Sequence, residues 1–167
     1  MAKIKKFLRH IITLSLSLLI VSVIMDVIRQ PEMPEQANHL LLRDLQQRPF
    51  FLAQLNQTEP VILYFWGSWC GYCQYTSPTI QTLAQEGVNV VSVALRSGTD
   101  EQVQTYLDEH HYQFTTVNDE DGTISKQWQV QVTPTIIILD KGKMAFATTG
   151  LTSYWGLKVR LFLTRFF

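Results

Sequence analysis

Two cysteines that follow a run of apolar residues constrain the fold of this chain most strongly. Residues 61–66 (VILYFW) are continuously apolar and rich in β-branched and aromatic side chains, a pattern typical of a central strand buried on both faces. Cys70 and Cys73, the only cysteines of the chain, come shortly afterwards. Open α/β sheets place their sites at the C-terminal edge of such strands. We therefore expect a site built around Cys70 and Cys73.

The spacing of the two cysteines predicts redox chemistry. Two intervening residues on the first turn of a helix put both sulfurs within disulfide reach, which needs Cα atoms about 4.4–6.8 Å apart. Cys70 then lies at the helix N-terminus, where free N–H groups and the helix dipole lower a cysteine pKa from about 8.5 into a range of about 3.5–7.5. We expect Cys70 to be the nucleophile and Cys73 the resolving thiol. The alternative is a structural disulfide, but a bridge across so short a loop removes little entropy from the unfolded chain.

The N-terminal segment predicts a membrane anchor. Residues 1–10 carry four basic side chains and no acidic one, and residues 11–28 form an apolar run interrupted only by Thr13, three serines and Asp26. This run is just long enough to cross a bilayer as a helix. The basic flank places the N-terminus in the cytoplasm and the remainder outside, in a compartment where disulfides persist. A cleaved signal peptide is the alternative, but no small-x-small cleavage site follows the run, so we expect an uncleaved anchor.

Composition and charge argue against two classes of protein. The apolar fraction of 46% and the charged fraction of 17% suit a globular protein with one very hydrophobic stretch, and neither value suggests disorder. From Arg29 onward, ten Lys or Arg stand against 13 Asp or Glu, a net charge of about −3. A mildly acidic body argues against nucleic-acid binding.

The rest of the chain predicts one α/β domain at residues 39–167, behind a proline-containing linker at residues 29–38. We expect a short strand or hairpin in residues 40–55 and then a turn. The patterns that follow predict strand 61–66, helix 71–86 with Pro78 inside it, strand 88–95, helix 100–110, strand 114–117, helix 124–130, strand 135–139, strand 144–149 and helix 153–167. The first strand–helix–strand unit is expected to form a right-handed parallel crossover, and the last two strands a hairpin.

The closing helix is predicted to turn one apolar face to the core. We expect that face to consist of Trp155, Val159, Phe162 and Leu163.

Two polar segments resemble metal sites only superficially. The spacing within residues 118–122 (NDEDG) does not match an EF-hand, so we expect a solvated loop that caps the next helix. His110 and His111 stand at a predicted helix end, where histidines neutralise the negative end of the dipole and stay solvated. We predict no metal site in either segment.

Residues 64–73 (YFWGSWCGYC) and residues 132–135 (VTPT), about 60 residues later, resemble the two signature motifs of the thioredoxin fold. An additional strand, a helix and the turn at residues 119–122 lie between them. The chain therefore resembles the membrane-tethered periplasmic group that includes the TlpA, ResA and DsbE proteins. The short, N-anchored form is similar to the suppressor of copper sensitivity protein D (ScsD) group. The resemblance covers residues 40–167 and implies a thioredoxin-like α/β fold: a central mixed β-sheet flanked by helices, with a TlpA-like strand–helix insertion.

The resemblance also implies roles for the site residues. The Thr133–Pro134 peptide bond is expected to be cis and to pack against the cysteine pair. Thr133 offers backbone groups to the substrate chain, and Pro134 keeps metal from bridging the thiolates. The Gly71-Tyr72 dipeptide tunes the pKa of the Cys70 thiolate and the reduction potential. From the residues themselves, Trp66 and Trp69 could both be core side chains, and we expect Trp66 to be core and Trp69 to be a partly exposed shield beside the thiolate.

Two departures from plain thioredoxin bear on this chemistry. Tyr64 stands six residues before Cys70, where plain thioredoxin has a buried Asp that helps to deprotonate the resolving thiol, so that base is missing or replaced. Tyr72 stands where thioredoxin has a proline. Potentials in this fold run from about −270 mV for thioredoxin to about −120 mV for DsbA. The sequence therefore leaves the direction of electron flow open.

Together these features predict a thiol:disulfide oxidoreductase that is held in the bacterial inner membrane by residues 11–28 and faces the periplasm, with no cofactor and no metal. Its expected partners are periplasmic protein thiols and disulfides and, by resemblance, a membrane electron-transfer protein of the DsbD or ScsB type. Three alternatives stay open. They are a disulfide-donating oxidant of the same fold, a protein that binds copper(I) or another soft metal through both thiolates, and an interaction module whose cysteines are incidental.

Overall fold

The computed structural model describes residues 6, 10, 12–14, 17 and 30–166, and the chain divides into two compact units, Met1–Gln30 and Pro31–Phe167. The predicted cytoplasmic segment and the predicted membrane anchor at residues 11–28 lie largely outside the described residues. Among those that are described, no helix combines the length and the apolar character needed to cross a bilayer.

The second unit begins at Pro31 and not at residue 39, where the sequence analysis places the start of the domain. Residues 31–38, predicted as a linker, pack on the domain. The backbone N–H of Glu32 donates to the carbonyl of Trp128, and Ala37, which opens the 3-10 helix η1 (Ala37–His39), is buried. The bond to Trp128 spans almost a hundred positions of the chain, which the composition of the segment does not reveal.

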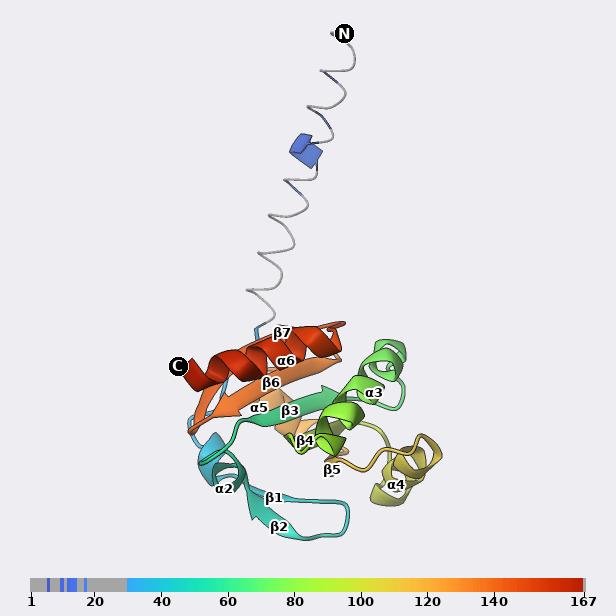
Figure 1. Ribbon diagram of the computed structural model, residues 1–167. Coiled ribbons are helices and arrows are strands. Elements are labelled where there is room, and N and C mark those ends of the chain that lie inside the picture. The colour runs from blue at the N-terminus through green and yellow to red at the C-terminus, as the bar shows by residue number, and fades with distance from the viewer. Residues whose placement is uncertain (1–5, 7–9, 11, 15–16, 18–29, 167) are drawn as a thin grey trace. The chain divides into compact units, whose positions relative to one another are not determined.

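A five-stranded mixed sheet forms the centre of the second unit, with the strand order β5-β4-β3-β6-β7 (Figure 1). Its strands are β3 (Val61–Trp66), β4 (Asn89–Leu95), β5 (Thr115–Asp119), β6 (Thr135–Asp140) and β7 (Lys143–Thr149). Strand β3 runs parallel to β4 and antiparallel to β6, and every one of its residues is buried. The predicted central strand, parallel crossover and final hairpin are therefore confirmed.

Alternate residues of β3 build two cores on the two faces of the sheet. Ile62, Tyr64 and Trp66 pack with side chains from α3 (Gly71–Gln85), α4 (Asp100–Glu109) and α6 (Tyr154–Leu163). The intervening residues of β3 pack with Leu52 of α2 (Leu52–Leu55) and with Trp128, which follows α5 (Thr123–Gln127). Two buried faces explain why the strand is apolar at every position.

The segment before β3 contains the predicted hairpin and one helix that was not predicted. Strands β1 (Leu41–Arg43) and β2 (Pro49–Phe51) pair antiparallel as a separate two-stranded sheet. Helix α2 follows directly, in a stretch that the sequence analysis assigned to the hairpin. It is only four residues long, too short to show a helical period.

The polar turn at residues 118–122 caps α5, as predicted, but it is not fully solvated. Asp119 is buried, and its carboxylate accepts hydrogen bonds from the backbone N–H groups of Ile124 (2.9 Å) and Ser125 (2.8 Å). Asp121 is exposed, and its carboxylate accepts hydrogen bonds from the backbone N–H and the hydroxyl of Thr123. A carboxylate at a helix N-terminus satisfies N–H groups that have no partner within the helix.

The prediction of which face of the closing helix points inward is wrong. Leu157 is buried and Leu161 packs against the same core, whereas the four side chains expected to face inward are exposed: Trp155, Val159, Phe162 and Leu163. Both rows of α6 are apolar, so periodicity alone does not distinguish the face that meets the sheet. The smaller leucine row lies against the core, and the larger aromatic row faces outward.

Candidate active site

Cys70 and Cys73 form a disulfide at the point where β3 leads into α3. Their Cα atoms are 5.3 Å apart, within the range that the spacing predicts. Cys70 is the N-cap residue of α3, and its sulfur accepts a hydrogen bond from the backbone N–H of Cys73 at 3.2 Å. Both cysteines are therefore where the sequence analysis placed them, on the first turn of a helix.

The position of each sulfur indicates what the reduced pair can do. A sulfur at the N-cap faces unpaired N–H groups and the positive end of the helix dipole, and both favour the thiolate. Cys70 retains 5% of its surface exposed, whereas Cys73 has none. An incoming disulfide can therefore reach Cys70 and not Cys73.

The loop before β6 meets this disulfide. The Thr133–Pro134 peptide bond is cis, and the carbonyl oxygen of Thr133 lies 3.5 Å from the sulfur of Cys70. Pro134 is buried, and its carbonyl accepts from the backbone N–H of Gly150 at 2.8 Å, which ties the loop to the end of β7. The expected cis bond and its packing against the cysteine pair are both confirmed.

Trp69 is held in a fixed position beside the disulfide, although 60% of its surface is exposed. Its indole Nε1–H donates to the carbonyl of Leu95 at the end of β4, at 3.0 Å. Gly67 makes room for the ring, because a Cβ there would lie 2.6 Å from an indole carbon. The hydroxyl of Ser97 accepts a hydrogen bond from the N–H of Ser68 and donates one to the same Leu95 carbonyl. We call the residues that hold the indole ring in place, Gly67, Leu95 and Ser97, the bracket around Trp69.

The bracket around Trp69 was not found from the sequence. Gly67 belongs to the motif at residues 64–73, but Ser97 and Leu95 belong to no motif, and only the parallel pairing of β3 with β4 brings the two segments together. By contrast, Trp66 lies in the core with no exposed surface, as expected, and its indole Nε1–H donates to the hydroxyl of Ser92.

The residues between and after the cysteines form an exposed aromatic rim. Gly71 is exposed at the start of α3, and nothing lies within 4 Å of the place its Cβ would occupy. Tyr72 is 64% exposed. Tyr75, which lies outside both signature motifs, is more exposed still.

Tyr64 occupies the place where plain thioredoxin has a buried acid, and it brings a hydroxyl in place of a carboxylate. The side chain is fully buried, and its hydroxyl lies 2.8 Å from the hydroxyl of Ser77. Ser77 stands one helical turn after Cys73 on the same buried side of α3. Burial raises the pKa of Tyr64, an effect that the hydrogen bond with Ser77 only partly offsets. This residue is therefore a neutral hydroxyl at physiological pH.

The histidine at the end of α4 contributes to an aromatic stack. The ring of His110 lies between those of Tyr106 and Tyr112, with centroids 4.1 and 5.7 Å away. Its Nδ1 lies 2.8 Å from the carbonyl oxygen of Tyr106. Within the described part of the chain, no group of three or more His, Cys, Asp or Glu residues is arranged to hold a metal ion. Copper binding by the two thiolates stays a prediction.

Comparison with known proteins agrees with this geometry. Residues 33–147 match the AhpC/TSA family. A thioredoxin-like protein of Haemophilus influenzae is 55% identical over 165 residues, which cover 99% of each chain. Thiol-disulfide oxidoreductase ResA of Oceanobacillus iheyensis is 33% identical over 79 residues, 45% of this chain and 41% of ResA.

A solved structure extends the similarity to the fold. It is that of a secreted Mycobacterium tuberculosis disulfide oxidoreductase homologous to E. coli DsbE. The TM-score is 0.66 at 25% sequence identity, and the match covers 76% of this chain and 97% of that one. ResA is named a thiol-disulfide oxidoreductase and the Mycobacterium tuberculosis protein a disulfide oxidoreductase, which confirms the predicted enzyme class. The chain belongs to the AhpC/TSA family of thioredoxin-like proteins, and its enzyme class is that of the thiol:disulfide oxidoreductases.

Proposed function

We propose that this protein is a membrane-anchored thiol:disulfide oxidoreductase that reduces disulfides of periplasmic proteins. One observation carries the proposal. The Cys70–Cys73 disulfide caps α3, and its more accessible sulfur lies beside the carbonyl of Thr133. A client chain that reaches Cys70 therefore passes a backbone acceptor next to the reacting sulfur.

The reaction follows from the two cysteine positions. The thiolate of Cys70 attacks one sulfur of a client disulfide, forms a mixed disulfide and releases the other client sulfur as a thiolate. The thiolate of Cys73 then attacks the sulfur of Cys70, restores the intramolecular disulfide and releases the second client thiolate. Two electrons pass to the client. A dithiol electron donor in the membrane, of the DsbD or ScsB type, then reduces the Cys70–Cys73 disulfide with two further electrons and is itself oxidised to a disulfide.

The membrane location rests on the N-terminal sequence. Four basic residues in the segment 1–10 precede the apolar run at 11–28, a pattern that favours a single-pass anchor with a cytoplasmic N-terminus and a periplasmic domain. The anchor and the short domain together support placement in the ScsD group. Attachment of a membrane-impermeant maleimide to reduced Cys70 in intact spheroplasts tests this topology. Protection of Cys70 until the membrane is opened would contradict it.

Trapping of the mixed disulfide tests the chemistry. In Cys73→Ser, the thiolate of Cys70 has no resolving partner, so we expect a covalent complex with client proteins that dithiothreitol releases. In Cys70→Ser no such complex should form, because Cys73 is fully buried. Equal trapping by both variants, or trapping by neither, would refute the assigned roles.

The direction of electron flow needs a separate measurement. Reductant and oxidant use the same bond exchanges in opposite order, and the reductant is supported by the resemblance of the chain to the TlpA-like group. Equilibration of the full-length protein with glutathione or dithiothreitol buffers gives its reduction potential. A value close to the thioredoxin potential of about −270 mV supports a reductant, and one close to the DsbA potential of about −120 mV would make the protein a disulfide donor.

A further inference from the structure

Charge is distributed very unevenly along the second unit. Residues 31–140 contain four Lys or Arg and 13 Asp or Glu, a net charge of −9. Residues 141–167 contain five Lys or Arg and no acidic residue, a net charge of +5. The last hairpin strand and the closing helix therefore form a cationic region on an otherwise acidic domain.

The closing helix also carries an apolar row that no described residue covers. Trp155, Val159, Phe162 and Phe166 recur at helical spacing through α6 and the 3-10 helix η2 (Thr164–Phe166), and all four are exposed, Trp155 by 73%. The rings of Phe162 and Phe166 pack edge to face, with centroids 5.1 Å apart. We call this row the α6 surface. Scattered apolar residues on a protein surface are ordinary, but apolar residues gathered along one helix face mark an interaction site.

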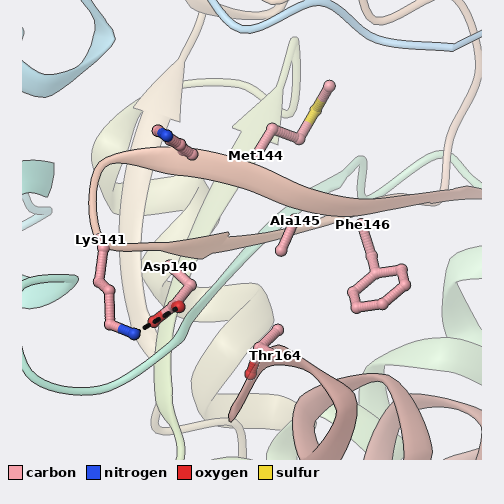
Figure 2. A pocket seen from close by; sticks show the side chains of 7 residues that line it. Asp140, Lys141, Met144, Ala145, Phe146 and Thr164 are labelled. Carbon is pink, nitrogen blue, oxygen red and sulfur yellow. Dashed lines mark ion pairs between the residues drawn. The ribbon is translucent and has the colours of Figure 1, made fainter. Parts of the chain in front are cut away.

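The tip of the β6–β7 hairpin brings two lysines to the C-terminal end of this helix. Lys141, Lys143 and Thr164 line one cavity of about 470 Å³. Figure 2 shows Ala145 and Phe146 on the side of β7 that faces Thr164, with Lys141 at the hairpin tip beside Asp140. The Lys141 side chain is 70% exposed and Lys143 is also exposed. Lys141 forms a long ion pair with Asp140, at 3.8 Å, and keeps its exposure, whereas Lys158 is paired with Glu86 at 2.7 Å and is 40% exposed. The hairpin lysines are therefore more accessible than Lys158.

We propose that the α6 surface and the two hairpin lysines dock the domain on an anionic phospholipid bilayer. A helix with an aromatic face and cations beside it lies in the headgroup region, where tryptophan is favoured and lysines attract anionic lipids. The acidic remainder of the domain is repelled by the same surface, so only this side can approach it. The inference goes beyond the proposed anchor, because it concerns how the folded domain is oriented and not how the chain is tethered.

Charge also argues against a second copy of this chain as the partner that covers the α6 surface. If two copies met through the α6 surface, residues 141–167 of one copy, with a net charge of +5, would face the same residues of the other. Like charges across an interface are costly. An anionic bilayer satisfies the apolar row and the lysines together.

Tryptophan quenching tests the proposal in the full-length protein. The chain has four tryptophans, of which Trp66 and Trp128 are fully buried and Trp69 and Trp155 are exposed. The protein is reconstituted in nanodiscs that contain phosphatidylglycerol and lipids brominated on the acyl chains. We expect the brominated lipids to quench the emission, Trp155→Phe to remove most of this quenching, and Trp69→Phe, the matched control, to retain it.

The charge requirement is tested by lipid and by variant. Replacing phosphatidylglycerol with phosphatidylcholine should reduce the Trp155 quenching, and Lys141→Gln and Lys143→Gln should each lower the ratio of docked to undocked protein by about fivefold. Quenching that is absent in both lipids, or equal in both, would overturn the proposal. Quenching that is lost in Trp69→Phe and retained in Trp155→Phe would also overturn the proposal. Two results together would overturn the proposal in favour of a dimer. They are a blue-shifted emission of Trp155 in the absence of lipid and disulfide cross-linking of two copies through Val159→Cys.

Discussion

The sulfur of Cys70 lies 3.5 Å from the carbonyl oxygen of Thr133, a residue 63 positions further along the chain. Strands β3 and β6 are antiparallel neighbours, with Phe65 opposite Thr135, so the end of one strand and the start of the other meet at the same edge of the sheet. The reacting sulfur and a substrate-facing backbone group are thus both positioned by the central strands of the sheet.

Gly67 should be needed for the position of Trp69. In Gly67→Ala the new Cβ would meet the indole ring, which has to leave its place and lose the bond to the Leu95 carbonyl. We expect a loss of about 1 kcal/mol in the free energy of unfolding, with a change in tryptophan emission, both measured in urea titrations. Gly71→Ala is the matched control, because nothing lies near its Cβ and alanine favours the helix. Equal losses in both variants would show that the ring position is unimportant.

The buried hydroxyl pair of Tyr64 and Ser77 should show energetic coupling. Tyr64→Phe leaves the Ser77 hydroxyl without this partner, and Ser77→Ala does the reverse, so each should cost about 1–2 kcal/mol. The double variant should cost less than the sum, with a coupling energy of about 1 kcal/mol. Urea unfolding of the four proteins measures it. Additive effects would mean that the two hydroxyls do not stabilise each other.

The same burial predicts a loss of stability in alkali. Burial raises the pKa of Tyr64 above its ordinary value of 10.0 and also raises those of Tyr106 and Tyr112. Above pH 10 the unfolded chain loses the tyrosine protons while the folded chain retains them, so stability is complete below that pH and falls as pH rises. Tyr64, which is fully buried, contributes a slope of up to about 1.4 kcal/mol per pH unit, and the partly exposed Tyr106 and Tyr112 contribute less because solvent screens them. Tyr64→Phe should unfold with a shallower slope between about pH 10 and pH 11.5, and an unchanged slope would contradict this account.

Asp119 should stabilise the start of α5. Its carboxylate accepts from two backbone N–H groups, those of Ile124 and Ser125, and Asp119→Asn replaces one acceptor oxygen with a donor. We expect a loss of about 1–3 kcal/mol in the free energy of unfolding, since the site is buried. Asp121→Asn, on the exposed side of the same turn, serves as the control and should have the smaller effect. The reverse order would mean that the exposed member holds the turn.

The sequence by itself determined the order of strands and helices from residue 61 onward and the place of the cysteine pair. A strand apolar at every position, a helix that starts at a cysteine and a threonine–proline step are local patterns, and the physics behind them acts within a few residues. Cys70 and Cys73 can therefore be identified from the amino-acid sequence, and Thr133 and Pro134 from its resemblance to the thioredoxin fold.

Only the tertiary structure decided what these residues touch. The bracket around Trp69, the Tyr64–Ser77 pair and the burial of Asp119 are contacts between separate elements or across a turn, and no local pattern encodes them. The orientation of α6 shows the reason most clearly. Both of its rows are apolar, so periodicity fits either face, and packing against the sheet selected the leucines and left Trp155, Val159 and Phe162 exposed.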